Sequence, residues 1–153
     1  MKRLGMVVLL AAAMLTPAIF GETPGRHPRY IHARSDLRTA QWFLQVREEP
    51  NVTRHLRRAD REVEAAIREI DRAAVIDRKD IDDHPRADTS LDRPGRFRKT
   101  MALLRSARED IDREEDNPRA RGWRNAAFSH IDAAMDAVRE AAREARLDRS
   151  LGY

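Results

Sequence analysis

The sequence contains no cysteine among its 153 residues, and only 5% of them are aromatic. The lack of cysteine excludes a disulfide-rich scaffold, a cysteine-based zinc site, an iron–sulfur protein and a c-type haem protein, because each of these needs thiols. A membrane protein with several spans is incompatible with a chain in which 37% of the residues are charged. A chain of this length holds at most one domain.

A large excess of charge of one sign is also lacking. The chain has 30 Lys and Arg against 26 Asp and Glu, and without Lys2 and Arg3 the balance is 28 against 26, or +2. The two signs are interleaved, as in residues 57–62 (RRADRE) and in residues 105–115. A nucleic-acid-binding protein usually gathers its positive charge on one face. The interleaving therefore predicts solvated, salt-bridged helix surfaces and no nucleic-acid partner.

Large aliphatic residues are scarce. From residue 22 onward, Leu, Ile, Val and Phe make up 23 of 132 residues, about 17%, a fraction found in disordered chains. Two features favour a folded domain: the net charge is close to zero, and the apolar residues recur periodically. The 19 Ala residues of this region favour helix. We expect a folded domain of modest stability, and the alternative is a domain that folds fully only on binding or self-association.

The N-terminus has the pattern of a secretory signal peptide. A basic start (Met1-Lys2-Arg3) precedes an uncharged apolar stretch over residues 4–20. Cleavage is expected after Ala18 or after Gly21. No Cys follows, which excludes a lipoprotein anchor, and an uncleaved N-terminal anchor is the alternative. The pattern predicts a periplasmic or secreted bacterial protein without a stable membrane span after processing.

The spacing of the apolar residues predicts four helices, over residues 30 or 35 to 48, 53–78, 92–115 and 118–148. The clearest stripe is Leu56, Val63 and Ile70, which are seven residues apart. No convincing strand pattern is present. Two short links favour an all-α, four-helix up-down-up-down bundle with a short first helix. The expected organisation is a signal peptide (1–21), an irregular lead-in (22–30), one helical-bundle domain (31–148) and a tail (149–153).

The histidines are the candidate metal ligands. His32 and Asp36 are four residues apart, which places them on one face if the first helix begins early. His84 lies in the long connection 79–93, and His130 falls on the apolar stripe of the fourth helix. Helix lengths in an up-down-up-down bundle place His32 or Asp36 close to His130. One interpretation is a structural hydrogen-bond network, and the other is a transition-metal site, which needs three or four converging ligands.

Catalytic motifs are missing. The sequence has no His-Glu-x-x-His or Glu-x-x-His pair, no serine in a nucleophile-elbow motif and no glycine-rich phosphate loop. Paired carboxylates such as Asp82-Asp83 and Glu114-Glu115 arise by chance in a charge-rich helical chain. The sequence therefore predicts neither an enzyme nor a cofactor.

Several motifs resemble those of a group of uncharacterised small exported all-helical proteins of soil bacteria. The resemblance covers most of residues 27–142. It rests on HPRYIHARSDLR (27–38), Asp83-His84-Pro85, EEDNPRARG (114–122) and His130-Ile131-Asp132. The resemblance implies an exported helical fold and brings no activity, cofactor or catalytic residue.

Two hypotheses for function follow. The first is an exported, non-catalytic helical bundle that binds a protein partner in the bacterial envelope, as a monomer or a weak homo-oligomer. The second is a small metal- or ligand-binding bundle that uses His32, Asp36, His84 and His130. Convergence of these side chains around one position distinguishes the second hypothesis from the first.

Overall fold

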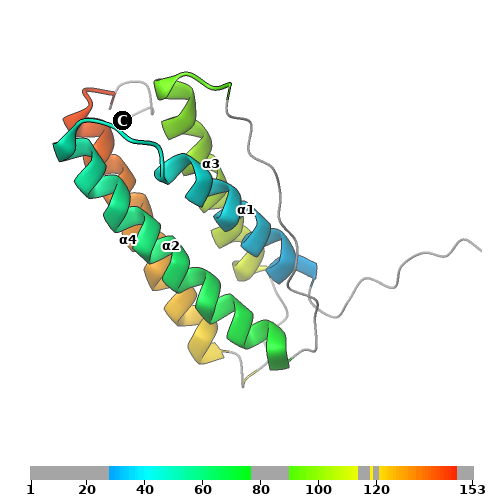
Figure 1. The fold of residues 1–153 in the computed structure, drawn as a ribbon. Helices are drawn as coiled ribbons and strands as arrows, with labels where there is room; N and C mark the ends of the chain where they lie inside the picture. Colours follow the sequence, from blue (N-terminus) through cyan, green and yellow to red (C-terminus); the bar gives the residue numbers. More distant parts are fainter. Residues whose placement is uncertain (1–27, 77–89, 114–117, 119–120, 148–153) are drawn as a thin grey trace, which may run out of the picture.

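The computed structural model describes residues 28–76, 90–113, 118 and 121–147, and it contains four α-helices packed side by side (Figure 1). These are α1 (Pro28–Leu44), α2 (Pro50–Ile76), α3 (Arg93–Asp112) and α4 (Arg121–Glu144). The predicted all-α four-helix bundle with a short first helix is confirmed. None of the described helices is both long enough and apolar enough to cross a membrane.

Helix ends differ from the expected ones by a few residues. α1 begins at Pro28, so the last part of the expected irregular lead-in is helical, and Tyr30 is already buried in the core. Pro28 and Pro50 each occupy the first position of a helix, where the missing N–H costs no hydrogen bond. α4 begins at Arg121, and Pro118, which was expected to open this helix, lies in a turn.

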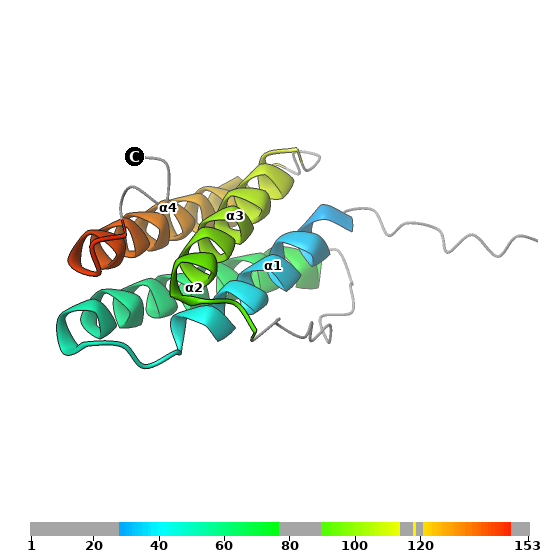
Figure 2. The ribbon, with the colours of Figure 1, turned by 90° about the horizontal axis from the view of Figure 1, so that it is seen from above.

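Each of the four helices, seen from above in Figure 2, packs against two of the others, so the bundle has four sides. α2 packs most extensively on α4 and α1 on α3, whereas α1 and α2, and α3 and α4, share smaller contacts. α1 and α4 occupy one diagonal of the bundle, and α2 and α3 occupy the other. Helices on a diagonal do not touch each other, which decides which of the sequence-predicted residues can meet.

The direction of α3 differs from the up-down-up-down order. Arg93 and Arg96 at the start of α3 pair with Glu48, which follows the end of α1. Arg108 near the end of α3 pairs with Asp132 in the first half of α4. α3 is therefore antiparallel to both α1 and α4 and parallel to α2, and the order is up-down-down-up (Figure 1).

The length of the connection between α2 and α3 explains why this order is possible. The end of α2 and the start of α3 lie at opposite ends of the bundle. Residues 77–92, most of which lie outside the described residues, can reach about 50 Å when extended, and α2 is about 40 Å long. Arg93, at the start of α3, accordingly lies at the end of α1 opposite Pro28.

Alanine accounts for the close packing of α2 on α4. Fully buried alanines recur every seven residues on both helices: Ala59, Ala66 and Ala73 on α2, and Ala127, Ala134 and Ala141 on α4. Small side chains let two helix backbones approach closely, and the seven-residue spacing keeps them on one face. The larger buried side chains fill the rest of the core, the largest fully buried ones being Leu37, Val52, Val63, Ile70, Met101, Leu104, Ile111, Ile131 and Val138.

Candidate functional site

His130 faces α2 in the structure. Its Nδ1 lies 2.8 Å from Glu62 Oε2, and both side chains are about one-third exposed. A similar pair links the same two helices closer to the start of α2, where His55 Nδ1 lies 3.0 Å from Glu140 Oε2. Each histidine thus has a carboxylate partner on the neighbouring helix, as the structural-network interpretation predicts.

His32 and Asp36 share one face of α1, as their spacing predicts, and this face is directed toward α3. Ser106 of α3 donates a hydrogen bond to the Asp36 carboxylate. Burial raises the pKa of Asp36 above its ordinary value, and the nearby Asp110 carboxylate adds to this rise. The Ser106 hydrogen bond and the positive charges of Lys99 and His32 offset part of it. His32 itself is exposed to solvent.

The expected approach of His32 or Asp36 to His130 is wrong. α1 and α4 lie on a diagonal of the bundle, so the first two residues face α3 while His130 faces α2. His84 lies outside the described residues. Within residues 28–76, 90–113, 118 and 121–147, no three His, Asp or Glu side chains converge in a way that could hold a metal ion.

A carboxylate cluster fixes the link between α1 and α2 against α3. The half-buried Glu48 carboxylate lies 3.0 Å from Arg93 Nε and 2.7 Å from Arg96 Nη2. Arg93 also forms a two-pronged pair with the exposed Glu49 carboxylate. The hydrogen bond to its own backbone and the Arg93 guanidinium hold the pKa of Glu49 below its usual value. Both acids of the link are therefore neutralised by arginines of α3.

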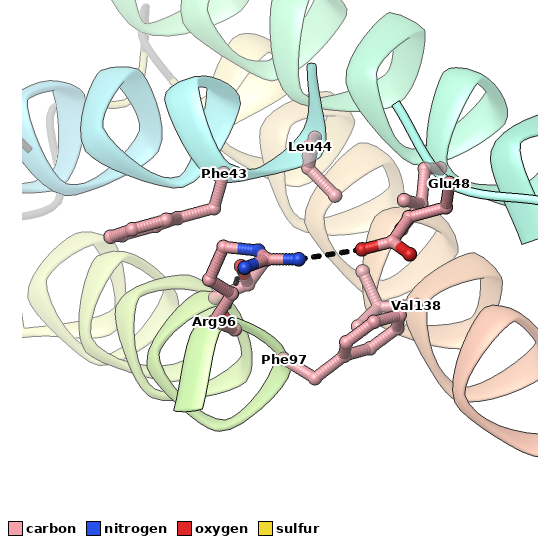
Figure 3. A pocket seen from close by; sticks show the side chains of 8 residues that line it. Phe43, Leu44, Glu48, Arg96, Phe97 and Val138 are labelled. Carbon is pink, nitrogen blue, oxygen red and sulfur yellow. Dashed lines mark hydrogen bonds and ion pairs between the residues drawn. The ribbon is translucent and has the colours of Figure 1, made fainter. Parts of the chain in front are cut away.

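A small cavity lies beside the Glu48–Arg96 pair, lined by Phe43, Leu44, Phe97 and Val138 among others (Figure 3). Its volume is about 10 Å³. A single buried water needs roughly 10–15 Å³, and ligand pockets usually occupy more than about 300 Å³. This cavity is too small for a ligand, so the interior of the bundle here is structural.

A larger, open groove lies at the start of α2 on the surface. Four arginines line it, Arg47 from the link and Arg54, Arg57 and Arg61 from α2, and its volume is about 440 Å³. Steps of three and four residues along a helix place the three α2 arginines on one face. We call this feature the arginine groove; its other lining residues are Glu48, Pro50 and Thr53.

The four guanidinium groups of the groove have no carboxylate partner within the described part of the chain. Apart from Asp60, the acids close to them in sequence are engaged elsewhere. Glu48 and Glu49 pair with arginines of α3, as described above, and Glu64 pairs with Arg68 at 2.9 Å. The first turn of α2 contains no acidic residue, so the partial positive charge of the helix N-terminus adds to that of the arginines.

A second hollow of about 240 Å³ adjoins the groove and shares Arg47, Thr53 and Arg57 with it. The half-buried Asp60 lines this hollow, and its Oδ1 has no hydrogen-bond partner among the described residues. Val46 also lines it, and Val46 is one of two large apolar side chains that the described surface exposes. The other is Trp42, which is 60% exposed.

The arginine groove could not be recognised from the interleaved charges of the sequence. Residues 57–62 suggested salt-bridged helix surfaces, and most other arginines of the described chain do pair in that way. One signal was available: Arg54 has no Asp or Glu three or four positions away on either side. A helical arginine without such a neighbour cannot form the usual pair along the helix.

No family model, curated protein or solved structure matches this chain. The resemblance to exported helical proteins of soil bacteria therefore stays a prediction from the quoted motifs.

Proposed function

We propose that this chain is an exported, non-catalytic binding module of the bacterial envelope whose arginine groove binds the anionic groups of a partner. The observation that carries the proposal is a set of four arginines around a hollow of about 440 Å³, none of which pairs with an acid among the described residues. The signal-peptide pattern of residues 1–21 supports export, and the lack of a catalytic motif in the sequence supports a binding role.

The chemistry of the groove fits an oxyanion. Guanidinium groups stay protonated at every physiological pH and donate paired hydrogen bonds to phosphate or carboxylate oxygens. Like charges three or four residues apart on a helix repel each other by a few tenths of a kcal/mol. Arg54, Arg57 and Arg61 stand in this relation, so their arrangement costs stability in the absence of an anion. An anion between them relieves the repulsion and binds the folded state only.

Thermal melts of the full chain with inorganic tripolyphosphate test the groove. Because the anion stabilises only the folded state, the melting midpoint should rise with its concentration, and it should rise less at high salt. Arg57→Glu should abolish the rise. Arg98→Glu is the matched control, because it makes the same change of charge at an exposed position of α3. Equal loss in both variants would mean that tripolyphosphate responds to net charge alone.

Arg57→Gln separates binding from stability. Without tripolyphosphate, this variant should melt at the same temperature as the wild type or slightly higher, because one repulsive charge is removed. With tripolyphosphate it should gain less than the wild type. A lower midpoint without the anion would show that Arg57 stabilises the fold, which is contrary to the proposal.

Export has its own test. Cell fractionation should recover the chain outside the cytoplasm, and its first residue should be Ile19 or Glu22. Recovery of the intact chain in the cytoplasm would reject the envelope role and leave the anion site untouched.

A further inference from the structure

One of the two exposed large apolar side chains of the described surface lies beside the arginine groove, and the other precedes it by four residues in the chain. Val46 is 36% exposed and lines the adjoining hollow together with Arg47 and Arg57. Trp42 is 60% exposed and lies in the last turn of α1, four residues before Val46. A tryptophan with this exposure is unusual in a protein that buries its other aromatic side chains wholly or partly, as the rest of the described chain does.

The combination of these residues is typical of surfaces that bind membranes. Tryptophan favours the boundary between lipid headgroups and acyl chains, because its ring is apolar and its N–H is polar. Arginines beside it are attracted to anionic headgroups and bond to lipid phosphates. The acids of the α1–α2 link do not oppose this attraction, because Arg93 and Arg96 already neutralise Glu48 and Glu49.

We propose that Trp42, Val46 and the arginine groove together form a docking surface for an anionic phospholipid membrane. Trp42 and Val46 insert at the level of the headgroups, and Arg47, Arg54, Arg57 and Arg61 bind lipid phosphates. The proposal rests on the anion-binding function proposed above and names its partner. A phospholipid can bind both the groove arginines and the exposed apolar side chains of Trp42 and Val46. A soluble anion can bind the arginines alone.

Vesicle flotation tests the surface with the full chain. The wild type should float to a greater extent with vesicles containing phosphatidylglycerol than with phosphatidylcholine vesicles, and salt should reduce this difference. Arg57→Glu should weaken binding at least about fivefold, the effect expected for one arginine at a charged membrane. Arg98→Glu should bind like the wild type. Residues 1–27 are common to all variants, so any contribution from them cancels in this comparison.

Fluorescence reports the insertion directly. In a Trp123→Phe variant, Trp42 is the sole tryptophan, and its emission should shift to shorter wavelength with phosphatidylglycerol vesicles. Trp42→Ala should weaken flotation, and Trp123→Phe should not. Vesicle binding that needs Arg57 but leaves the Trp42 emission unchanged would overturn the proposed insertion.

The two proposals fail in distinguishable ways. A tripolyphosphate response that depends on Arg57, together with no preference for phosphatidylglycerol vesicles, would overturn the membrane inference and retain the anion site. No response to either probe would reject both. Tighter binding to single-stranded RNA than to the vesicles at the same salt concentration would replace the lipid with a nucleic-acid partner.

Discussion

His130 Nδ1 lies 2.8 Å from Glu62 Oε2, across the interface between α2 and α4. The His55–Glu140 pair spans the same interface in the opposite sense, with the histidine on α2 and the acid on α4. Hydrogen bonds of this kind hold the ring of a histidine in one orientation. Because a carboxylate only accepts hydrogen bonds, His130 Nδ1 carries the proton and donates it to Glu62, so Nδ1 has no lone pair left for a metal.

We expect His130→Ala to lower the free energy of unfolding only modestly, by about 0.5–1 kcal/mol, because a partly exposed pair of side chains contributes little. Urea denaturation of the wild type and the variant measures this difference. Melting midpoints should not change with Zn²⁺, Cu²⁺ or Ni²⁺. A rise that a chelator reverses, and that disappears in His130→Ala, would restore the metal-binding hypothesis with His84 as the remaining candidate ligand.

Leu104 is fully buried in the centre of α3. Truncation of a buried leucine removes its transfer free energy and leaves a cavity, at a typical cost of about 2–5 kcal/mol. Leu104→Ala should therefore reduce the urea midpoint strongly, and the chain should be close to unfolding if its core is as thin as its composition suggests. Val46→Ala, at an exposed position, should change the free energy of unfolding by less than about 0.5 kcal/mol. Similar effects of both substitutions would contradict the assignment of the core.

At the start of α3, the effect of Gly95→Ala on stability should change sign between the wild type and an Asp92→Ala variant. Asp92 caps this helix, and its Oδ1 accepts a hydrogen bond from the Gly95 N–H at 2.7 Å. A Cβ atom at position 95 would lie 2.5 Å from this oxygen, so Gly95→Ala must displace the cap, at a cost of about 1 kcal/mol. In an Asp92→Ala background the clash is absent, and the higher helix propensity of alanine should stabilise the chain by up to about 1 kcal/mol. Destabilisation in both backgrounds would refute this account of the cap.

The periodicity of the sequence was enough to predict the helices and much of the core. Leu56, Val63 and Ile70 recur every seven residues, and all three are buried on one side of α2. Such a stripe depends only on local geometry, because residues seven positions apart lie on the same face of any α-helix. The same periodicity placed the helix ends to within a few residues.

The direction of α3 and the arginine groove could not be predicted in this way. A connection as long as residues 77–92 can join helices of either relative direction, so local patterns leave the order undecided. The positive charge of the groove depends on which nearby acids pair with residues of α3. Glu48 lies beside Arg47 in the sequence, but its carboxylate is bound by Arg93 and Arg96. Both features are properties of the tertiary arrangement.

Asp36 provides a prediction about pH. Its pKa in the folded chain is raised above 3.8, first by burial and then by Asp110. A carboxyl group with a raised folded-state pKa contributes stability that is complete below the unfolded pKa and is lost as pH rises through the folded-state value. The difference in melting midpoint between the wild type and Asp36→Asn should therefore be most favourable to the wild type near pH 3 and decline toward pH 6. A difference that grows with pH would mean that the ionised carboxylate is stabilised, contrary to the observed burial.

The up-down-down-up order is open to a distance measurement, because the chain has no cysteine that would compete for labels. Gln45 follows the end of α1, and Gly122, where an added side chain meets open space, lies at the start of α4. In this structure α1 and α4 are parallel, so spin labels at Gln45→Cys and Gly122→Cys should be more than about 25 Å apart, given the rise of a helix. Labels at Gln45→Cys and Arg143→Cys, at one end of the bundle, should give a clearly shorter distance. The reverse ranking of the two distances is what an up-down-up-down bundle would produce, and it would reject the helix order on which the arginine groove depends.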